Sequence, residues 1–228
     1  MNELAQKLIE ELQCETVFTI PVLGGIPVSE AVVFTWIIMA VLVIAAFILT
    51  RNLKVDHISK RQAVAESIVI GLMNMVQGMV GEKGRKYVPY LTTVMLYIGV
   101  SNIIGLFGFK SPTKDLRVTV ALALMSIILI EAAGIYHKGV KRWLHGFVEP
   151  VAIVTPINIL EVVTKPLSLC MRLFGNVLGA FVIMELLKMI LPVGLPVVFS
   201  LYFDIFDGLL QAYVFVFLTS LYIDEITE

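Results

Sequence analysis

The chain has 228 residues, 58% of them hydrophobic and only 15% charged, and its mean hydropathy is +0.92. This composition excludes an ordinary soluble domain. The net charge of -1, with no four adjacent basic residues, argues against nucleic acid as a partner. Continuous apolar runs of about 20 residues predict membrane-crossing helices, because barrel strands alternate apolar and polar residues. We therefore expect an all-α integral membrane protein.

The apolar segments predict about five membrane-crossing helices in a single domain, 1–228. We expect residues 1–30 to form an N-terminal tail, residues 31–49, 87–109 and 118–136 to span the membrane, and residues 150–192 and 197–223 to form a hairpin. Residues 61–82 carry apolar side chains at helical spacing and polar ones elsewhere on the wheel. That pattern predicts an amphipathic helix on the membrane surface.

The apolar stretch from 151 to 191 is too long for one upright crossing. As a helix it would extend roughly 60 Å, about twice the ~30 Å hydrocarbon thickness. It must tilt steeply, break at a proline such as Pro166, or do both. The sequence LPVGLP at 191–196 indicates a turn, so 150–192 and 197–223 are predicted to form a long tilted hairpin.

Lys and Arg residues predict the orientation. Ten lie in the segments 50–86 and 137–149, against four in 1–30 and 110–117 together. Basic loops stay in the cytoplasm, so we expect an outer N-terminus, a cytoplasmic C-terminus, and the helix 61–82 on the cytoplasmic side.

A polar stripe runs along each of the two helices of the predicted hairpin. At about 100° per residue, one narrow face of the first helix carries Asn158, Glu161, Lys165, Ser168, Arg172 and Asn176. Gly175 and Gly179 border this face and would let another helix approach closely. On the last helix, one face carries Ser200, Asp204, Asp207, Gln211 and Tyr222. Intramembrane ionisable groups on one face are typical of a path for ions or protons.

Arg172 is the most demanding residue of these stripes. A charge at the centre of a spanning helix costs about 2.5 to 3.5 kcal/mol. No carboxylate lies three or four positions from Arg172, and its guanidinium cannot lose its charge. We therefore expect its counter-charge to lie on another chain.

Structural roles account equally well for several other polar residues. Lys165 and Lys188 could extend their charges to the membrane surface, and Glu185 could pair with Lys188. Asp115 could serve only as a helix N-cap. Asn158, Ser168 and Asn176 could form hydrogen bonds between helices. Cys14 and Cys170 lie far apart and predict neither a disulfide framework nor a metal site, and no cofactor motif is present.

The sequence from the first span to the C-terminus resembles subunit a of the F-type ATP synthase, the static membrane subunit beside the rotating ring of c subunits. The resemblance is carried by PTKDLRVTVALAL at 112–124, PINILE at 156–161, KPLSLCMRLFGN at 165–176 and LLQAYVFVFLTSLYI at 209–223. The combination of RLFGN with QAYVF about 35 residues later is highly specific, whereas PTKDL alone would be weak.

The resemblance implies roles in ion translocation for residues of both stripes. Arg172 matches the essential arginine, and Asn176 and Gln211 match polar residues near it. Glu161, Lys165 and Ser168 match further positions on the same helix, and Asp115 matches an acidic position associated with the outer half-channel. Where many members carry Glu or His nine residues after the arginine, this chain has Phe181. The outer path here is expected to use Asp204 and Asp207.

The resemblance also implies partners and a setting. It predicts a non-catalytic subunit in the inner or plasma membrane of a bacterium, contacting the c-subunit ring, the b subunits of the peripheral stalk and membrane lipid. The ion stays open between proton and sodium, because the selective carboxylate belongs to the ring. The alternative is a stand-alone ion transporter or channel, which the absence of an inverted repeat disfavours. The motifs HExxH and GxSxG, which would indicate a hydrolase, do not occur.

Overall fold

A computed structural model describes residues 16–20, 26–51, 59–82, 84–107, 111–148, 152–190, 194 and 199–227. Helices form nearly all of this structure, which confirms the all-α class. The long helices are α2 (Glu30–Thr50), α3 (Lys60–Val80), α4 (Val88–Ile103), α5 (Leu116–Lys138), α7 (Thr155–Ile190) and α9 (Gly208–Thr227). The short ones are η1 (Arg85–Tyr87), η2 (Ile104–Phe107), η3 (Pro112–Lys114), α6 (Val140–Gly146), η4 (Ala152–Val154) and η5 (Leu201–Asp207).

Within the described residues, six helices are long and apolar enough to cross a membrane, one more than the five predicted spans. The additional candidate is α3, which the sequence predicts to lie on the membrane surface. Helix α3 has 21 residues and is apolar enough to cross a membrane. It also carries polar side chains such as Glu66, which suit a helix on the membrane surface. The surface position of α3 stays a prediction.

The chain enters the first helix through a small antiparallel ribbon that the sequence analysis did not predict. Strand β1 (Thr16–Ile20) pairs with strand β2 (Ile26–Ser29), and Ser29 leads directly into α2. The apolar β-branched residues of TVFTI and the turn residues before IPVS suit such a hairpin. The predicted tail therefore contains ordered structure next to the first span.

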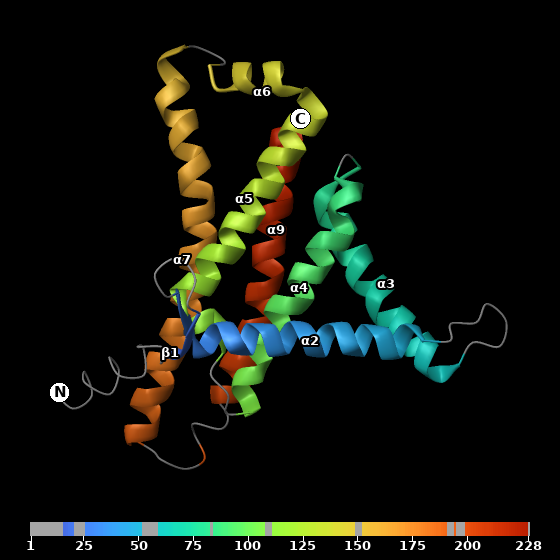
Figure 1. Ribbon diagram of the computed structural model, residues 1–228, viewed down its shortest axis with the longest axis vertical. Helices are drawn as coiled ribbons and strands as arrows, with labels where there is room; N and C mark the ends of the chain where they lie inside the picture. The colour runs from blue at the N-terminus through green and yellow to red at the C-terminus, as the bar shows by residue number, and fades with distance from the viewer. Residues whose placement is uncertain are drawn as a thin grey trace.

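Helices α3, α4, α5 and α7 pack around α9 (Figure 1). Helices α4 and α5 both contact α9, α3 packs on α4 and α9, and α7 packs mainly on α5. One buried cluster joins Ile98, Leu122, Leu173 and Phe215, so that α4, α5, α7 and α9 share a core. The other buried cluster holds α3 against the far end of α9. Helix α7 thus lies at the edge of the bundle.

Helix α7 runs unbroken through Pro166 for 36 residues, about 54 Å at 1.5 Å per residue. It exceeds the ~30 Å hydrocarbon thickness, so the structure favours tilt over a break at this proline. Helix α2 lies crosswise to α7 (Figure 1). A bilayer that α2 crosses upright would therefore contain α7 at a steep tilt. Of the turn predicted at 191–196, only Gly194 lies within the described residues.

Candidate functional site

One side of α7 is packed and the other is open. Leu169, Cys170 and Leu173 are buried against the core, whereas Ser168 and Arg172 are exposed. A methyl group added to Gly175 or Gly179 would meet nothing within 4 Å. The part of this face at Arg172, Gly175 and Gly179 is therefore not covered by the described residues, as the predicted approach of a partner helix requires.

Arg172 has no carboxylate partner among the described residues. The ion pairs of the described part of the chain join Lys165 to Glu161 and to Glu225, and none includes Arg172. Arg172 is exposed on α7, next to the exposed apolar side chain of Met171. The predicted location of its counter-charge on another chain is consistent with this arrangement.

Directly beside Arg172, a hydrogen bond joins the two polar helices. Asn176 Nδ2 donates to Gln211 Oε1 across 2.5 Å. Gln211 is only 2% exposed, and its Nε2 has no hydrogen-bond partner among the described residues. A buried amide with an unused donor can offer that donor to a water or to an incoming group. The structure brings Asn176 and Gln211 together one helical turn from Arg172.

Asp204 and Asp207 lie on a wider turn that precedes α9. The segment η5 is π-helical, so its i→i+5 hydrogen bonds shift the residues that follow relative to a uniform α-helical wheel. Both carboxylates are half-buried. Asp204 Oδ1 would lie 3.1 Å from a methyl group added to Gly105, so this carboxylate faces the η2 turn after α4. The glycine leaves the space that the carboxylate occupies.

A buried polar network near Asp204 was missed by the sequence analysis. Asn102 Nδ2 donates to the carbonyl of Gly208 at 3.0 Å, and Thr113 Oγ1 donates to Asn102 Oδ1 at 2.8 Å. Ser111 Oγ lies 2.7 Å from Thr113 Oγ1 and 2.7 Å from the carbonyl of Ser101, to which it donates. These bonds fix the start of α9 against α4 and η3. The sequence feature that could have indicated this network is Asn102, a polar residue within an apolar segment.

Asp115 is the N-cap of α5, as one of the two interpretations predicts. Its Oδ1 accepts from the backbone N–H of Arg117 at 2.9 Å, and its Oδ2 accepts from Ser29 Oγ at 2.8 Å. The residue is 7% exposed. Asp115 therefore ties the start of α5 to the end of β2, and a role in an ion path would come in addition to this structural one.

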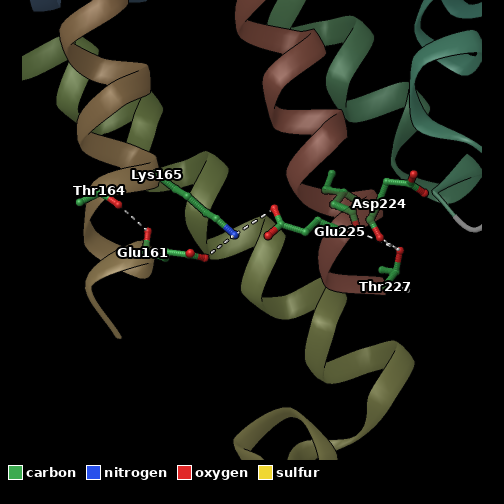
Figure 2. Close-up of polar contacts among 7 residues, drawn as sticks. Glu161, Thr164, Lys165, Asp224, Glu225 and Thr227 are labelled. Atoms are coloured by element: carbon green, nitrogen blue, oxygen red, sulfur yellow. Dashed lines mark hydrogen bonds and ion pairs between the residues drawn. The ribbon is translucent and has the colours of Figure 1, made fainter. Parts of the chain in front are cut away.

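At the other end of α7, Lys165 bridges to α9 (Figure 2). Its Nζ lies 3.1 Å from Glu225 Oε2 and 3.7 Å from Glu161 Oε2, and it stands 5.3 Å from the centre of the Tyr222 ring. The lysine side chain is 19% exposed, whereas both glutamates are about half exposed. Lys165 thus pairs with two carboxylates, rather than only extending toward the membrane surface. Glu225 is a partner of Lys165 that the stripes did not include.

The remaining polar residues have separate environments. Asn158 Nδ2 donates to the carbonyl of Phe147 at 3.0 Å and so faces the segment before α7. Glu131 accepts from Trp143 Nε1 at 2.9 Å. Lys114 places its ammonium 4.2 Å from the centre of the Phe181 ring.

The predicted pair of Glu185 with Lys188 cannot be placed, because the Lys188 side chain lies outside the described residues. Within the described part, no three His, Cys, Asp or Glu side chains are grouped to hold a metal.

Comparison with known proteins assigns the family. Residues 32–224 match the model of the family described as ATP synthase A chain. The chain is 36% identical to ATP synthase subunit a of Moorella thermoacetica over 203 residues, which cover 88% of this chain and 92% of the relative. The chain belongs to the ATP synthase subunit a family. It is also 34% identical to the sodium ion specific subunit a of Propionigenium modestum, over 87% of this chain and 74% of the relative.

Membership in the subunit a family confirms the resemblance found in the sequence. It makes the chain a non-catalytic, ion-translocating membrane subunit of an ATP synthase complex. Subunit a of Acaryochloris marina, 31% identical over 88% of this chain and 86% of its own, extends the similarity to a third bacterium. The exposed face of α7 therefore belongs to a protein that functions within a larger assembly.

Proposed function

We propose that this subunit a conducts ions to and from carboxylates of the c-subunit ring through two offset half-channels, and that Arg172 separates them. The observation that carries this proposal is the position of Arg172. It is an exposed, permanently charged side chain on the open face of α7, with no ion-pair partner among the described residues. A ring carboxylate approaching beside Gly175 and Gly179 would supply the missing charge.

The energetics explain why such a pair would form and break. A ring carboxylate without its ion is costly in hydrocarbon, but about 4 Å from a guanidinium, at an effective dielectric of 20, it gains about 4 kcal/mol. Once it binds an ion it becomes neutral and can leave Arg172. The fixed positive charge also repels a cation that would pass directly between the half-channels. Rotation and ion flow are thereby coupled.

The two half-channels are assigned to opposite ends of the polar face. The outer one would use Asp204, Asp207 and Asp115, and the inner one Glu161, Lys165 and Ser168. Two features support this division. Asp204 lies at the end of the bundle formed by η2 and η5, and Lys165 pairs with Glu225 at the end formed by the start of α7 and the end of α9. Each singly charged ion that crosses a membrane potential of 100 mV releases about 2.3 kcal/mol, which would drive the rotation of the ring.

The same proposal includes the partners and orientation predicted from the sequence. The open face of α7 would contact the c ring, and the b subunits of the peripheral stalk would contact another side. The N-terminus would lie outside and the C-terminus, near Lys165, in the cytoplasm. Whether protons or sodium ions are carried can be tested by measuring ATP hydrolysis by the whole complex with and without sodium.

Reactivity of introduced cysteines tests the outer half-channel. In a complex whose Cys14 and Cys170 are replaced by alanine, Asp204→Cys and Asp207→Cys should react rapidly with a membrane-impermeant thiol reagent added on the outer side. Leu201→Cys and Phe206→Cys are matched controls on the same turn, since both side chains are exposed and apolar. Equal rates at all four positions would rule out the assignment.

A further inference from the structure

Basic residues gather at the end of the molecule where α5 leads into α6. They come from two segments that are about 50 residues apart in the sequence, the η1 turn and the α5–α6 junction. The basic residues of this cluster, which we call the basic end, are Arg85, Lys86, His137, Lys138, Lys141 and Arg142. The stretch from 132 to 148 contains no acidic residue. This stretch of the chain is therefore positively charged.

Contacts between aromatic and basic side chains join the two segments. Lys86 Nζ donates to Tyr136 Oη at 3.1 Å and lies 4.7 Å from the centre of the same ring. The rings of Tyr87 and His137 pack edge to face with centroids 6.4 Å apart. Tyr136 is nevertheless 68% exposed. Tyrosines with an exposed ring and a polar tip are typical of the boundary between the bilayer and water.

Helix α6 has the side-chain pattern of a helix in that boundary. At about 100° per residue, Val140, Trp143 and Leu144 fall on one side, and Lys141 and Arg142 fall on the other. Val140 and Leu144 are 57% and 55% exposed, so the described residues leave them largely uncovered. Figure 1 shows α6 turned across the end of α5. Such a helix buries its apolar side in the acyl region and keeps its basic side at the headgroups.

Carboxylates also lie at this end of the molecule, namely Glu82, Glu131, Asp224 and Glu225, and two of them are engaged by other side chains. Glu131 accepts from Trp143 Nε1, which holds α6 against α5. Glu225 pairs with Lys165 on α7. Lys141 and Arg142 are both exposed and have no ion pair among the described residues. Their charges are therefore available to a ligand that lies in the plane of the membrane surface.

We propose that the basic end is a binding site for the headgroup of an anionic phospholipid. The phosphate would lie among Lys86, Lys141 and Arg142, and the acyl chains would pass along Val140, Leu144 and the exposed Tyr136. Basic clusters at the ends of membrane helices attract anionic headgroups, and each Lys or Arg near the surface adds to the attraction. A zwitterionic lipid has no net charge and lacks this attraction. The site is separate from the polar face of α7 and goes beyond the proposed ion path.

Lipid retention by the purified complex tests the site. The intact ATP synthase would be washed in detergent, supplied with phosphatidylglycerol or phosphatidylcholine, and analysed by native mass spectrometry for bound lipid. We expect selective retention of phosphatidylglycerol. The double variant Lys141→Gln, Arg142→Gln should weaken its binding by roughly 30-fold, since each basic residue contributes about a factor of five. Higher salt should weaken binding by the wild type.

The control is Arg117→Gln, which removes one positive charge at the opposite end of α5. Arg117 is exposed and its side chain makes no contact with the basic end. This variant should retain the lipid as the wild type does. Equal lipid retention by the double variant, or equal retention of phosphatidylcholine, would overturn the proposal. Loss of another subunit from the double variant, with lipid retained, would overturn it too and assign the surface to a protein contact.

Discussion

Asn176 on α7 and Gln211 on α9 are joined by a hydrogen bond of 2.5 Å, although they lie 35 positions apart in the sequence. This bond sets the register of the two helices that carry the polar stripes. Asn176 follows Arg172 by one helical turn, so the bond also fixes the backbone that presents the arginine. The donor left over on Gln211 points to a polar interaction that another group completes.

Removing this bond should impair ion-driven ATP synthesis without dismantling the complex. Asn176→Ala and Gln211→Ala each leave the other amide without its partner, and interhelical bonds in membranes contribute about 0.6 kcal/mol, up to about 1.7. The effects on the midpoint temperature of unfolding should be less than additive in the double variant. Asn74→Ala on α3 is a control, because Asn74 is exposed and distant from α7. Additive losses would show that the two amides act independently.

The two roles of Asp115 can be separated by two substitutions. Asp115→Ala removes the acceptor for the Arg117 N–H and should cost about 1 kcal/mol of stability. Asp115→Asn keeps an N-cap acceptor and should fold as the wild type does. Its neutral amide, however, cannot take up and release a proton or attract a cation as a carboxylate does. We expect Asp115→Asn to lower ion-driven ATP synthesis while the midpoint temperature is kept. Full synthesis by this variant would restrict Asp115 to its capping role.

Loss of Lys165 should lower the stability of the complex more than loss of the Glu225 charge does. Lys165→Met leaves both Glu161 and Glu225 without a partner, whereas Glu225→Gln leaves the contact with Glu161 intact. Partly exposed pairs contribute about 0.2 to 1 kcal/mol, so both effects are small and the first should be larger. Thermal unfolding of the complex measures the order. Lys60→Met, an exposed lysine at the start of α3, controls for loss of one charge. The reverse order would mean that Glu225 has a different partner in the assembly.

Bulky side chains on the glycine face should block the proposed ring contact. Gly175→Leu and Gly179→Leu point into open space, so the chain itself can accommodate them. We expect subunit a to insert while the c ring fails to co-purify, or co-purifies without supporting ATP synthesis. Gly71→Leu on α3 is matched, since that glycine is also exposed and unobstructed. Normal co-purification and synthesis with Gly175→Leu would place the ring elsewhere.

Much of the fold follows from apolar periodicity and length. The span predicted at 118–136 is the middle of α5, and the segment 150–192 contains all of α7. Hydropathy shows where a helix must lie in lipid, but not its neighbours. The position of α5 between α7 and α9 therefore required the structure. The β1–β2 ribbon was missed because its strands are only five and four residues long.

The site was partly predictable for the same reason. A uniform helical wheel holds on α7 and places Asn176 on the face of Arg172, whereas the proximity of Gln211 was implied by the family resemblance. The wheel fails at Asp204, since η5 is π-helical and turns this carboxylate toward Gly105. The contacts of Asn102 with Gly208 and of Lys165 with Glu225 join residues that are 106 and 60 positions apart. Spacing within one helix contains no information on such pairs.

Ion-driven ATP synthesis by a complex carrying Arg172→Ala tests whether Arg172 separates the two half-channels. The variant would be purified, reconstituted into vesicles and energised by an ion gradient, with Arg117→Ala as the control for loss of an exposed arginine. We predict an assembled complex that synthesises no ATP, because nothing would then hold an ionised ring carboxylate at the interface or stop ions from passing between the half-channels. Synthesis at the wild-type rate would show that Arg172 does not have this role.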